Sequence, residues 1–479
     1  MCIRDRITDY QLFENDRSLN AAIKTADYIL SRWDKKPADF GREMVDLHVL
    51  TTGIDWAILK LYKVTGEKRF LNFSENLKPL TQWDTEITIG RRTGVSGHMF
   101  AYFAMCEAQL ELYRLTGNDD LLSQTRNAID FFVAQDGLTI TGSAGQREIW
   151  TDDQDGEESL GETCSTAYQL RVYNNLLRLT GNSKLGDLIE RTVFNGLFAA
   201  QSPDGKMIRY YTPFEGPREF YPHEHMCCPG NLRRIMAKLP EMVYFETEEK
   251  GIAVNLYTAS TTSFTDAKGI NVQIQQKTDY PTSGKIEILV NPDKATSFPL
   301  LLRIPSWVEN ANVEVNGKKW NAPGGQFLRI HREWTPNDKI SLEFPMDFRF
   351  VKGRKRNAGR VALMRGPVIY SLNLTKNPEV TNNGERTYFD LPKILLDPET
   401  LTGPFTDESV RPNGTSANIK GWIEKNSGLA EGDHEFNLKL TEFPDPGSEL
   451  TYFKIPDYSI EVDDELVDKS GELIKVEVK

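Results

Sequence analysis

One local pattern recurs three times in the first half of the chain and restricts how that half can fold. The segments LKLYKVTGEKRFL, LELYRLTGNDDLL and YNNLLRLTGNSKL cover residues 59–71, 110–122 and 173–185. In each, an apolar helix end is followed by Thr-Gly, a polar pair and a new apolar start. The glycine stops one helix and the next residues open another. Repeated helical hairpins of this kind stack into a solenoid or close into a ring.

Strand patterns dominate from about residue 251 onward. Segments such as INVQIQQKTDY and KISLEFPMDF alternate between apolar and polar residues, and Asn316-Gly317 has the composition of a hairpin turn. These patterns predict a helical domain over 1–252 and a β-sandwich domain over 253–372. Residues 373–479 are rich in Pro, Gly, Asp and Asn with weaker strands, and we expect a second, looser β-rich domain there.

The length and charge of the chain exclude some classes of function. The 479 residues predict two or three domains, and the net charge of -12 disfavours binding to nucleic acid or anionic membranes. A transmembrane helix is not expected, because no stretch approaches about 18 consecutive apolar residues. The first residues, MCIRDRITDYQ, lack the apolar core of a secretory signal and look like a cut edge. The sequence does not decide between a cytoplasmic and a periplasmic location, and it is compatible with a homodimer.

The cysteines carry the sharpest chemical signal. The sequence has five of them, and an odd number does not suggest a disulfide framework. Cys227 and Cys228 are adjacent, and two neighbouring thiolates can bind one borderline metal ion, usually zinc. Upstream, the i, i+2 spacing of Glu162 and Cys164 in an extended segment would put both side chains on one side. Three sulfurs and one carboxylate are enough for a tetrahedral site.

Such a site has a structural and a catalytic interpretation. A closed four-ligand set is typical of structural zinc, and a buried cysteine pair needs no metal at all. Alternatively, zinc keeps one sulfur as a thiolate, which can attack an anomeric carbon and form a covalent glycosyl-enzyme. That reaction needs a proton donor. Glu148 is a candidate, because Ile149 and Trp150 would desolvate it, although the acidic DDQDGEE that follows also suits a solvated loop.

Two histidines are candidates for contacts with a substrate. His98 follows Gly97 at an expected helix start, where it either points into the cavity of a helical ring or caps the helix. His225 precedes the cysteine pair by two residues and would orient a ligand, contact a sugar or lie at the surface.

From about Leu47 to about Leu372 the sequence resembles glycoside hydrolase family 127, the bacterial β-L-arabinofuranosidases. The resemblance rests on an ordered set of landmarks: Gly97-His98, Gly142-Ser143 to Glu148, Glu162-Thr163-Cys164, Phe194-Asn195-Gly196, Cys227-Cys228-Pro229 with Asn231, Val254-Asn255-Leu256-Tyr257, Tyr280-Pro281, Arg303-Ile304-Pro305-Ser306-Trp307 and Val315-Asn316-Gly317. ETC together with CCP and Asn231 is highly specific.

The resemblance implies an (α/α)6-type toroid followed by β-sandwich domains. It implies a retaining glycoside hydrolase that releases terminal L-arabinofuranose or a related sugar from glycans. The residues matching the zinc ligands are Glu162, Cys164, Cys227 and Cys228. Cys227 also matches the nucleophile and Glu148 the general acid/base, while His98 and Tyr210 match substrate contacts. Tyr211 fits the position of the substrate-contacting tyrosine equally well.

The sequence also departs from the family pattern. The family's CCPPN appears here as CCPGN, the loop between Glu148 and Glu162 is about two residues short, and Thr52-Gly53 replaces an early Gly-His pair. About 250 residues supply only some eight to ten helices of ordinary length, so we expect a toroid incomplete at its N-terminus. Two rivals follow: a toroid enzyme using paired carboxylates among Asp152, Asp153 and Asp155 with structural zinc, or a non-catalytic glycan-binding protein.

Overall fold

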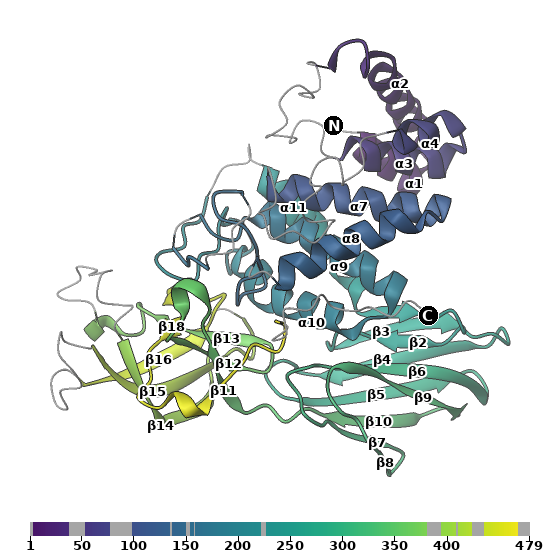
Figure 1. The fold of residues 1–479 in the computed structure, drawn as a ribbon. Helices are drawn as coiled ribbons and strands as arrows, with labels where there is room; N and C mark the ends of the chain where they lie inside the picture. Colours follow the sequence, from purple (N-terminus) through teal and green to yellow (C-terminus); the bar gives the residue numbers. More distant parts are fainter. Residues whose placement is uncertain are drawn as a thin grey trace.

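A helical part of the chain packs against two β-sheet units (Figure 1). The computed structural model describes residues 3–37, 53–76, 98–134, 137–149, 154–157, 159–221, 227–380, 394–408, 411–423 and 435–467. Its helices are α1 (Ile3–Phe13), α2 (Asp16–Arg32), α3 (Ile54–Thr65), α4 (Lys68–Glu75), α7 (Met99–Thr116), α8 (Asp119–Ala134), α9 (Thr163–Thr180), α10 (Ser183–Thr192), continued by the π-helical turn Val193–Leu197, and α11 (Cys227–Met236).

Three glycines end helices as the repeated pattern predicts. Gly66, Gly117 and Gly181 follow α3, α7 and α9 with φ of 71°, 71° and 66°. Each donates its backbone N–H to the carbonyl four residues earlier, and α4, α8 and α10 begin two residues later. The helical hairpins are therefore confirmed, because a left-handed residue closes each helix and turns the chain.

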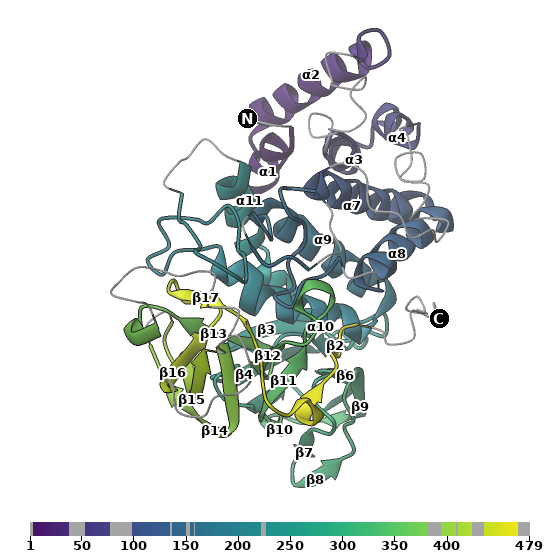
Figure 2. The same ribbon diagram turned by 60° about the vertical axis from the view of Figure 1, so that its left-hand side comes forward.

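The helices bury two separate apolar clusters. Residues of α7 to α11, such as Phe103, Leu170 and Ile235, form the larger cluster, whereas Ile7, Ile58 and Phe70 belong to a smaller one among α1 to α4. The first and second sets of helices are in contact where α1 lies beside α11. Figure 2 shows α1 beside α11, and an ion pair of 3.5 Å joins Asp5 of α1 to Arg234 of α11.

The first β unit is a sandwich of two sheets. Its strands are β1 (Tyr244–Glu246), β2 (Ile252–Val254), β3 (Ser260–Thr265), β4 (Asn271–Thr278), β5 (Lys285–Pro292), β6 (Thr296–Ile304), β7 (Asn312–Val315), β8 (Lys318–Trp320), β9 (Gln326–Trp334) and β10 (Asp338–Glu343). The sheet orders are β1-β2-β6-β9 and β3-β4-β5-β10-β7-β8, with a shared apolar core. Asn316 and Gly317 have φ of 49° and 84° between β7 and β8, which confirms the predicted hairpin turn.

The second β unit is one large sheet with the order β14-β15-β16-β13-β12-β11-β19. Its strands are β11 (Phe348–Lys352), β12 (Val361–Arg365), β13 (Val368–Asn373), β14 (Ile394–Thr406), β15 (Thr415–Ile423), β16 (Glu435–Glu442), β17 (Ser448–Leu450), β18 (Tyr452–Phe453) and β19 (Glu461–Val462). Strands β11 to β13 thus pair with the C-terminal strands. We therefore propose a boundary near residue 346, in place of the 372/373 boundary expected from the sequence.

A buried ion-pair cluster fastens the helices to the sandwich. Arg303 of β6 is fully buried and donates to Asp187 and, at 2.7 Å, to Glu190 of α10. Tyr280 adds a hydrogen bond of 2.8 Å to the Glu190 carboxylate. These contacts hold α10 against the sandwich, and α10 in turn packs on α9, whose first turn carries Cys164.

Candidate functional site

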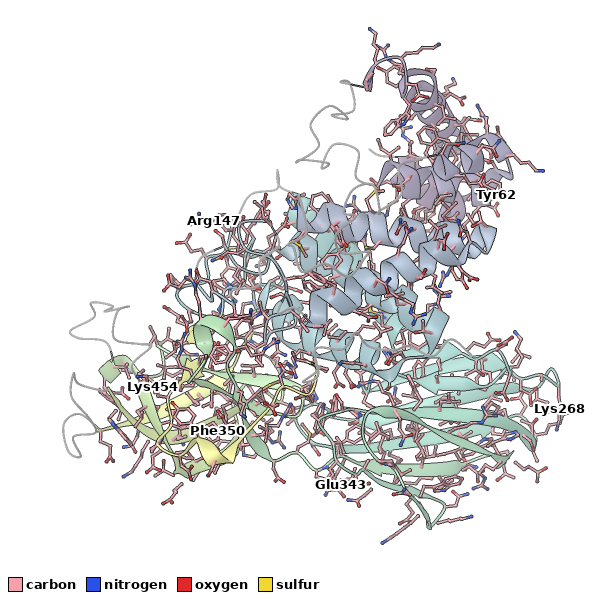
Figure 3. The ribbon with its side chains drawn as sticks, in the orientation of Figure 1. Tyr62, Arg147, Lys268, Glu343, Phe350 and Lys454 are labelled. Atoms are coloured by element: carbon pink, nitrogen blue, oxygen red, sulfur yellow. The ribbon has the colours of Figure 1, made fainter. Side chains whose placement is uncertain are left out.

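Glu148 lies in a tight turn with an unfavourable backbone conformation. Gln146 and Ile149 exchange both backbone hydrogen bonds, at 2.9 and 3.0 Å, and the central residues Arg147 and Glu148 have φ of 48° and 67°. Two positive φ angles are typical of a type I′ turn, which Asn-Gly normally occupies. Strain at a residue of this kind marks candidate functional positions. Figure 3 labels Arg147 in the loops beside the helices.

Polar side chains surround the Glu148 carboxylate. The hydroxyl of Tyr210 donates a short hydrogen bond to Oε1, and the hydroxyl of Tyr211 lies 3.4 Å from the same oxygen. His98 Nε2 lies 3.2 Å from Oε2. The expected apolar cover is not provided by Ile149, whose side chain is 54% exposed, because the turn directs it to solvent. Trp150 lies outside the described residues.

The position of His98 fixes its tautomer. It is the N-cap of α7, and its Nδ1 accepts the backbone N–H of Phe100 at 3.3 Å. Burial lowers the pKa of the imidazole, which favours the neutral ring. An accepting Nδ1 leaves the proton on Nε2, so Nε2–H donates to Glu148. His98 therefore caps the helix, as one interpretation of the sequence expected, and its ring also lies against Glu148.

Four side chains with sulfur or carboxylate atoms form a second group next to Glu148. The ligand atoms of Glu162, Cys164, Cys227 and Cys228 all lie within 4.8 Å of one another, and we call these four residues the Cys–Glu cluster. Sγ of Cys164 and Sγ of Cys228 are 3.2 Å apart. Helix ends bring the group together, because Glu162 is the N-cap of α9 and the cysteine pair opens α11.

The cluster forms in a different way from the one expected. The i, i+2 spacing predicted that Glu162 and Cys164 lie on one side of an extended segment. In the structure Cys164 belongs to the first turn of α9. The two side chains meet because the N-cap residue lies half outside the helix, so its side chain turns back over the first turn. The predicted grouping of the four side chains is thus present, although the predicted local geometry was wrong.

The electrostatics of the cluster favour a cation. Burial raises the pKa of Glu162 to about 8, and no hydrogen bond reaches its Oε1 from the described residues. The pKa of Cys227 lies well below its usual value because Cys164 and Cys228 donate hydrogen bonds to its sulfur. A raised pKa means that ionised Glu162 is disfavoured in this buried position, and a bound cation would offset that cost. Three sulfurs and one carboxylate are a donor set that zinc accepts, so the residues present fit this metal.

Tyr210 connects the two groups. Its hydroxyl lies 4.0 Å from Sγ of Cys227 in addition to its hydrogen bond with Glu148. On the opposite side, His98 Nδ1 lies 3.8 Å from Oε2 of Glu162. Cys227 is exposed while Cys164 and Cys228 are buried, so the sulfur that lies near the Tyr210 hydroxyl is also the accessible one.

Some sequence candidates cannot be placed. His225, Asp152 and Asp153 lie outside the described residues. Asp155 is described, and its Oδ2 pairs with Nη1 of Arg356 at 2.8 Å. Within the described ranges no helix combines the length and apolarity needed to cross a membrane.

The sequence predicted no role at the cluster for two residues, Ser165 and Asn231, although Asn231 is one of the landmarks of the family resemblance. The Ser165 hydroxyl donates to Oε2 of Glu162 at 2.8 Å, and the Asn231 amide donates to Sγ of Cys164 at 3.1 Å. Helical spacing was the available signal. Ser165 follows Glu162 by three residues and Asn231 follows Cys228 by three, so each pair shares a helix face.

The fold and the site define the class of this protein. It is a multidomain protein in which a unit of helical hairpins, with its site at helix ends, is followed by β-sheet units. The chain belongs to glycoside hydrolase family 127. The family model described as "Beta-L-arabinofuranosidase, GH127 catalytic domain" matches residues 2–241, and the model of the family's middle domain matches residues 251–346.

Individual relatives agree with this assignment. A non-reducing end β-L-arabinofuranosidase of Bifidobacterium longum subsp. longum is 27% identical over 438 residues, which cover 78% of this chain and 64% of that protein. The chain thus spans less than two thirds of the length of this curated relative.

Solved structures show the same fold. A GH127 β-L-arabinofuranosidase from Geobacillus stearothermophilus T6 superimposes with a TM-score of 0.75 and 23% identity, covering 95% of this chain and 79% of the other. Another GH127 β-arabinofuranosidase gives a TM-score of 0.78 and 21% identity, covering 96% and 77%. The predicted arrangement of a helical toroid-type domain followed by β-rich domains is therefore confirmed.

Proposed function

We propose that the chain is a retaining glycoside hydrolase that removes terminal L-arabinofuranose, or a related sugar, from glycans. The observation that carries the proposal is the link from Glu148 through Tyr210 to Cys227. Glu148 supplies a carboxyl group that can donate a proton, and Cys227 supplies a sulfur that can attack carbon. Tyr210 lies between the two. The Bifidobacterium relative's name, a non-reducing end β-L-arabinofuranosidase, supports the sugar class.

In the first step the exposed Cys227 sulfur attacks the anomeric carbon of the sugar. The carbon–sulfur bond forms as the bond to the leaving oxygen breaks, and Glu148 gives its proton to that oxygen. Tyr210 and His98 contact the two oxygens of the Glu148 carboxyl group, which orients it between them. The polar side chains around the carboxylate also suit contacts to sugar hydroxyls.

In the second step Glu148 acts as a base. It takes a proton from a water molecule, the water oxygen attacks the anomeric carbon, and the carbon–sulfur bond breaks. Two displacements at one carbon return the original configuration. The sugar is released with retained configuration and both side chains regain their starting protonation states.

The Cys–Glu cluster would hold zinc through Glu162, Cys164, Cys227 and Cys228. When bound, the metal stabilises thiolates at neutral pH and balances the charge of the buried carboxylate. Burial of Cys164 and Cys228 supports a ligand role for these two sulfurs, while the exposure of Cys227 leaves it able to reach a substrate.

Trapping of the covalent intermediate tests the proposal. With a p-nitrophenyl β-L-arabinofuranoside, whose leaving group needs little protonation, Glu148→Gln should form the intermediate but hydrolyse it slowly. Intact-protein and peptide mass spectrometry should then find one pentosyl group on Cys227. A label on another residue, or release of a sugar with inverted configuration by NMR, would refute the mechanism.

A further inference from the structure

The three sulfurs of the Cys–Glu cluster have different surroundings. Cys164 is fully buried and accepts an N–H from the side-chain amide of Asn231, with 3.1 Å between Nδ2 and Sγ. Sγ of Cys227 lies 4.0 Å from the Tyr210 hydroxyl. The sulfur that receives an amide donor is thus a buried one, and the sulfur that faces the candidate acid is another.

Asn231 reaches Cys164 because of its place on α11. It follows Cys227 by four residues and Cys228 by three, so it lies on the face of the helix that carries the pair. Side chains on a helix lean toward its N-terminus, which directs the amide toward the sulfurs. Asn231 is only 5% exposed, so its hydrogen bond is protected from water.

The orientation of the Asn231 amide follows from its other neighbour. Nη1 of Arg234 lies 3.3 Å from Oδ1 of Asn231. A guanidinium group has no acceptor, so the amide atom that faces it must be the oxygen, and the amide nitrogen faces the sulfur. Arg234 in turn pairs with Asp5 of α1 at 3.5 Å. Helix α1 therefore helps to hold the amide in the donating orientation.

We propose that Asn231 is a positioning residue that differentiates the three sulfurs. Its N–H withdraws electron density from the Cys164 sulfur, which keeps that sulfur as a ligand and a poor nucleophile. Cys227 remains the accessible sulfur. The inference rests on the proposed function, because it assigns the division of labour among the thiolates of that same site.

Metal binding by the full chain tests this role without measuring hydrolysis. Asn231→Leu keeps the approximate side-chain volume and removes the donor. We expect zinc affinity, measured by competition with a chelator, to fall by roughly 10–100-fold, as for other outer partners of metal ligands. In the Co²⁺-substituted protein the sulfur-to-metal charge-transfer band should move to lower energy, because the Cys164 sulfur regains electron density.

Two further variants separate this effect from a general loss of packing. Asn174→Leu replaces an asparagine on α9 that is 6% exposed, ten residues from Cys164, and it should leave the band unchanged. Arg234→Met, at a half-exposed position, keeps the donor and releases the amide oxygen. It should give a smaller shift in the same direction even if Asn231→Leu fails to fold.

The outcomes distinguish the two proposals. An unchanged band and affinity in folded Asn231→Leu, or in Arg234→Met if the leucine variant does not fold, would overturn the role of Asn231. A wild-type chain that binds neither Zn²⁺ nor Co²⁺ would overturn it as well. Metal binding that depends on Asn231, in a wild type that hydrolyses neither arabinofuranosides nor glycosides of related sugars, would support the role of Asn231 and refute the proposed function.

Discussion

His98 Nε2 lies 3.2 Å from Oε2 of Glu148. Because the other ring nitrogen of His98 accepts the backbone N–H of Phe100, the ring is fixed at the start of α7 and can only donate to the carboxylate. Tyr210 donates to the other carboxylate oxygen. The side chain of a residue in a strained turn is therefore held from both sides.

Removal of the proton donor should slow hydrolysis according to the leaving group. For Glu148→Gln we expect kcat to fall by roughly 10²–10⁴-fold on an alkyl arabinofuranoside, whose leaving oxygen requires protonation. The first step should suffer much less with p-nitrophenol as the leaving group. A rapid-quench burst measured on both substrates checks this. Equal first-step losses on the two substrates would contradict an acid role.

Relief of the turn strain should stabilise the protein. Asparagine adopts positive φ more readily than arginine, so Arg147→Asn should raise the free energy of unfolding by roughly 1 kcal/mol. Arg147→Ala serves as the control, because alanine keeps the strain and should give little change. Urea unfolding of both variants measures the difference. A stabilised alanine variant together with an unchanged asparagine variant would show that the turn is not strained.

The buried Arg303 should be important for joining the helices to the sandwich. Arg303→Met leaves the Asp187 and Glu190 carboxylates buried without their partner. Loss of one partner from a buried ion pair costs about 3–5 kcal/mol. Adding Asp187→Asn and Glu190→Gln to Arg303→Met should restore part of that stability. Denaturant unfolding of the single and triple variants tests this, and a single variant as stable as wild type would oppose it.

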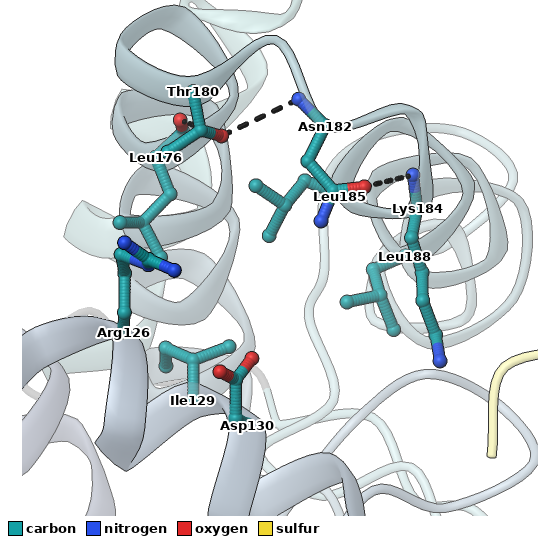
Figure 4. A pocket seen from close by; sticks show the side chains of 9 residues that line it. All are labelled: Arg126, Ile129, Asp130, Leu176, Thr180, Asn182, Lys184, Leu185 and Leu188. Atoms are coloured by element: carbon teal, nitrogen blue, oxygen red, sulfur yellow. Dashed lines mark hydrogen bonds between the residues drawn. The ribbon is translucent and has the colours of Figure 1, made fainter. Parts of the chain in front are cut away.

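Asp130 should make stability depend on pH. It lies with Arg126 and Lys184 in a small pocket between α8, α9 and α10, and burial raises its pKa to about 7 (Figure 4). Because the pKa of Asp130 is higher in the folded state, its contribution to folding stability is fully present below about pH 4. That contribution is lost as the pH rises toward 7. The loss amounts to about 4 kcal/mol for three pKa units.

Asp130→Asn should remove that dependence. The variant should therefore be more stable than wild type at pH 8, and the difference should shrink as the pH falls to 5. Asp119→Asn, at the exposed start of the same helix, is the matched control and should not reproduce this pH dependence. Urea unfolding across this pH range provides the comparison. A variant less stable than wild type at pH 8 would show that Asp130 is ionised and paired.

The sequence predicts the elements whose causes are local. Thr-Gly at the ends of α3, α7 and α9 and Asn-Gly between β7 and β8 each determine one backbone conformation, and they were predicted correctly. The membership of the Cys–Glu cluster was also predicted, because few residue types can fill a metal site. The turns depend on residue type and spacing, whereas the packing of α11 on α9 brings the four side chains of the cluster together.

Other features depend on the tertiary fold. Strands β12 and β13 are buried along their whole length, so no alternation of buried and exposed residues indicates which sheet they join. The central positions of the turn, Arg147 and Glu148, are neither glycine nor asparagine, so the sequence did not predict a turn there. Tyr210 and Tyr211 are neighbours in the sequence, and only the folded chain shows that both hydroxyls approach Glu148.

Zinc content and hydrolysis, measured on the same preparation, show whether a zinc-bound Cys227 thiolate is the nucleophile. We expect one zinc ion per chain and hydrolysis of p-nitrophenyl β-L-arabinofuranoside by the wild type, with hydrolysis abolished in a folded Cys227→Ser variant. A chain without zinc, or a Cys227→Ser variant as active as the wild type, would contradict this mechanism.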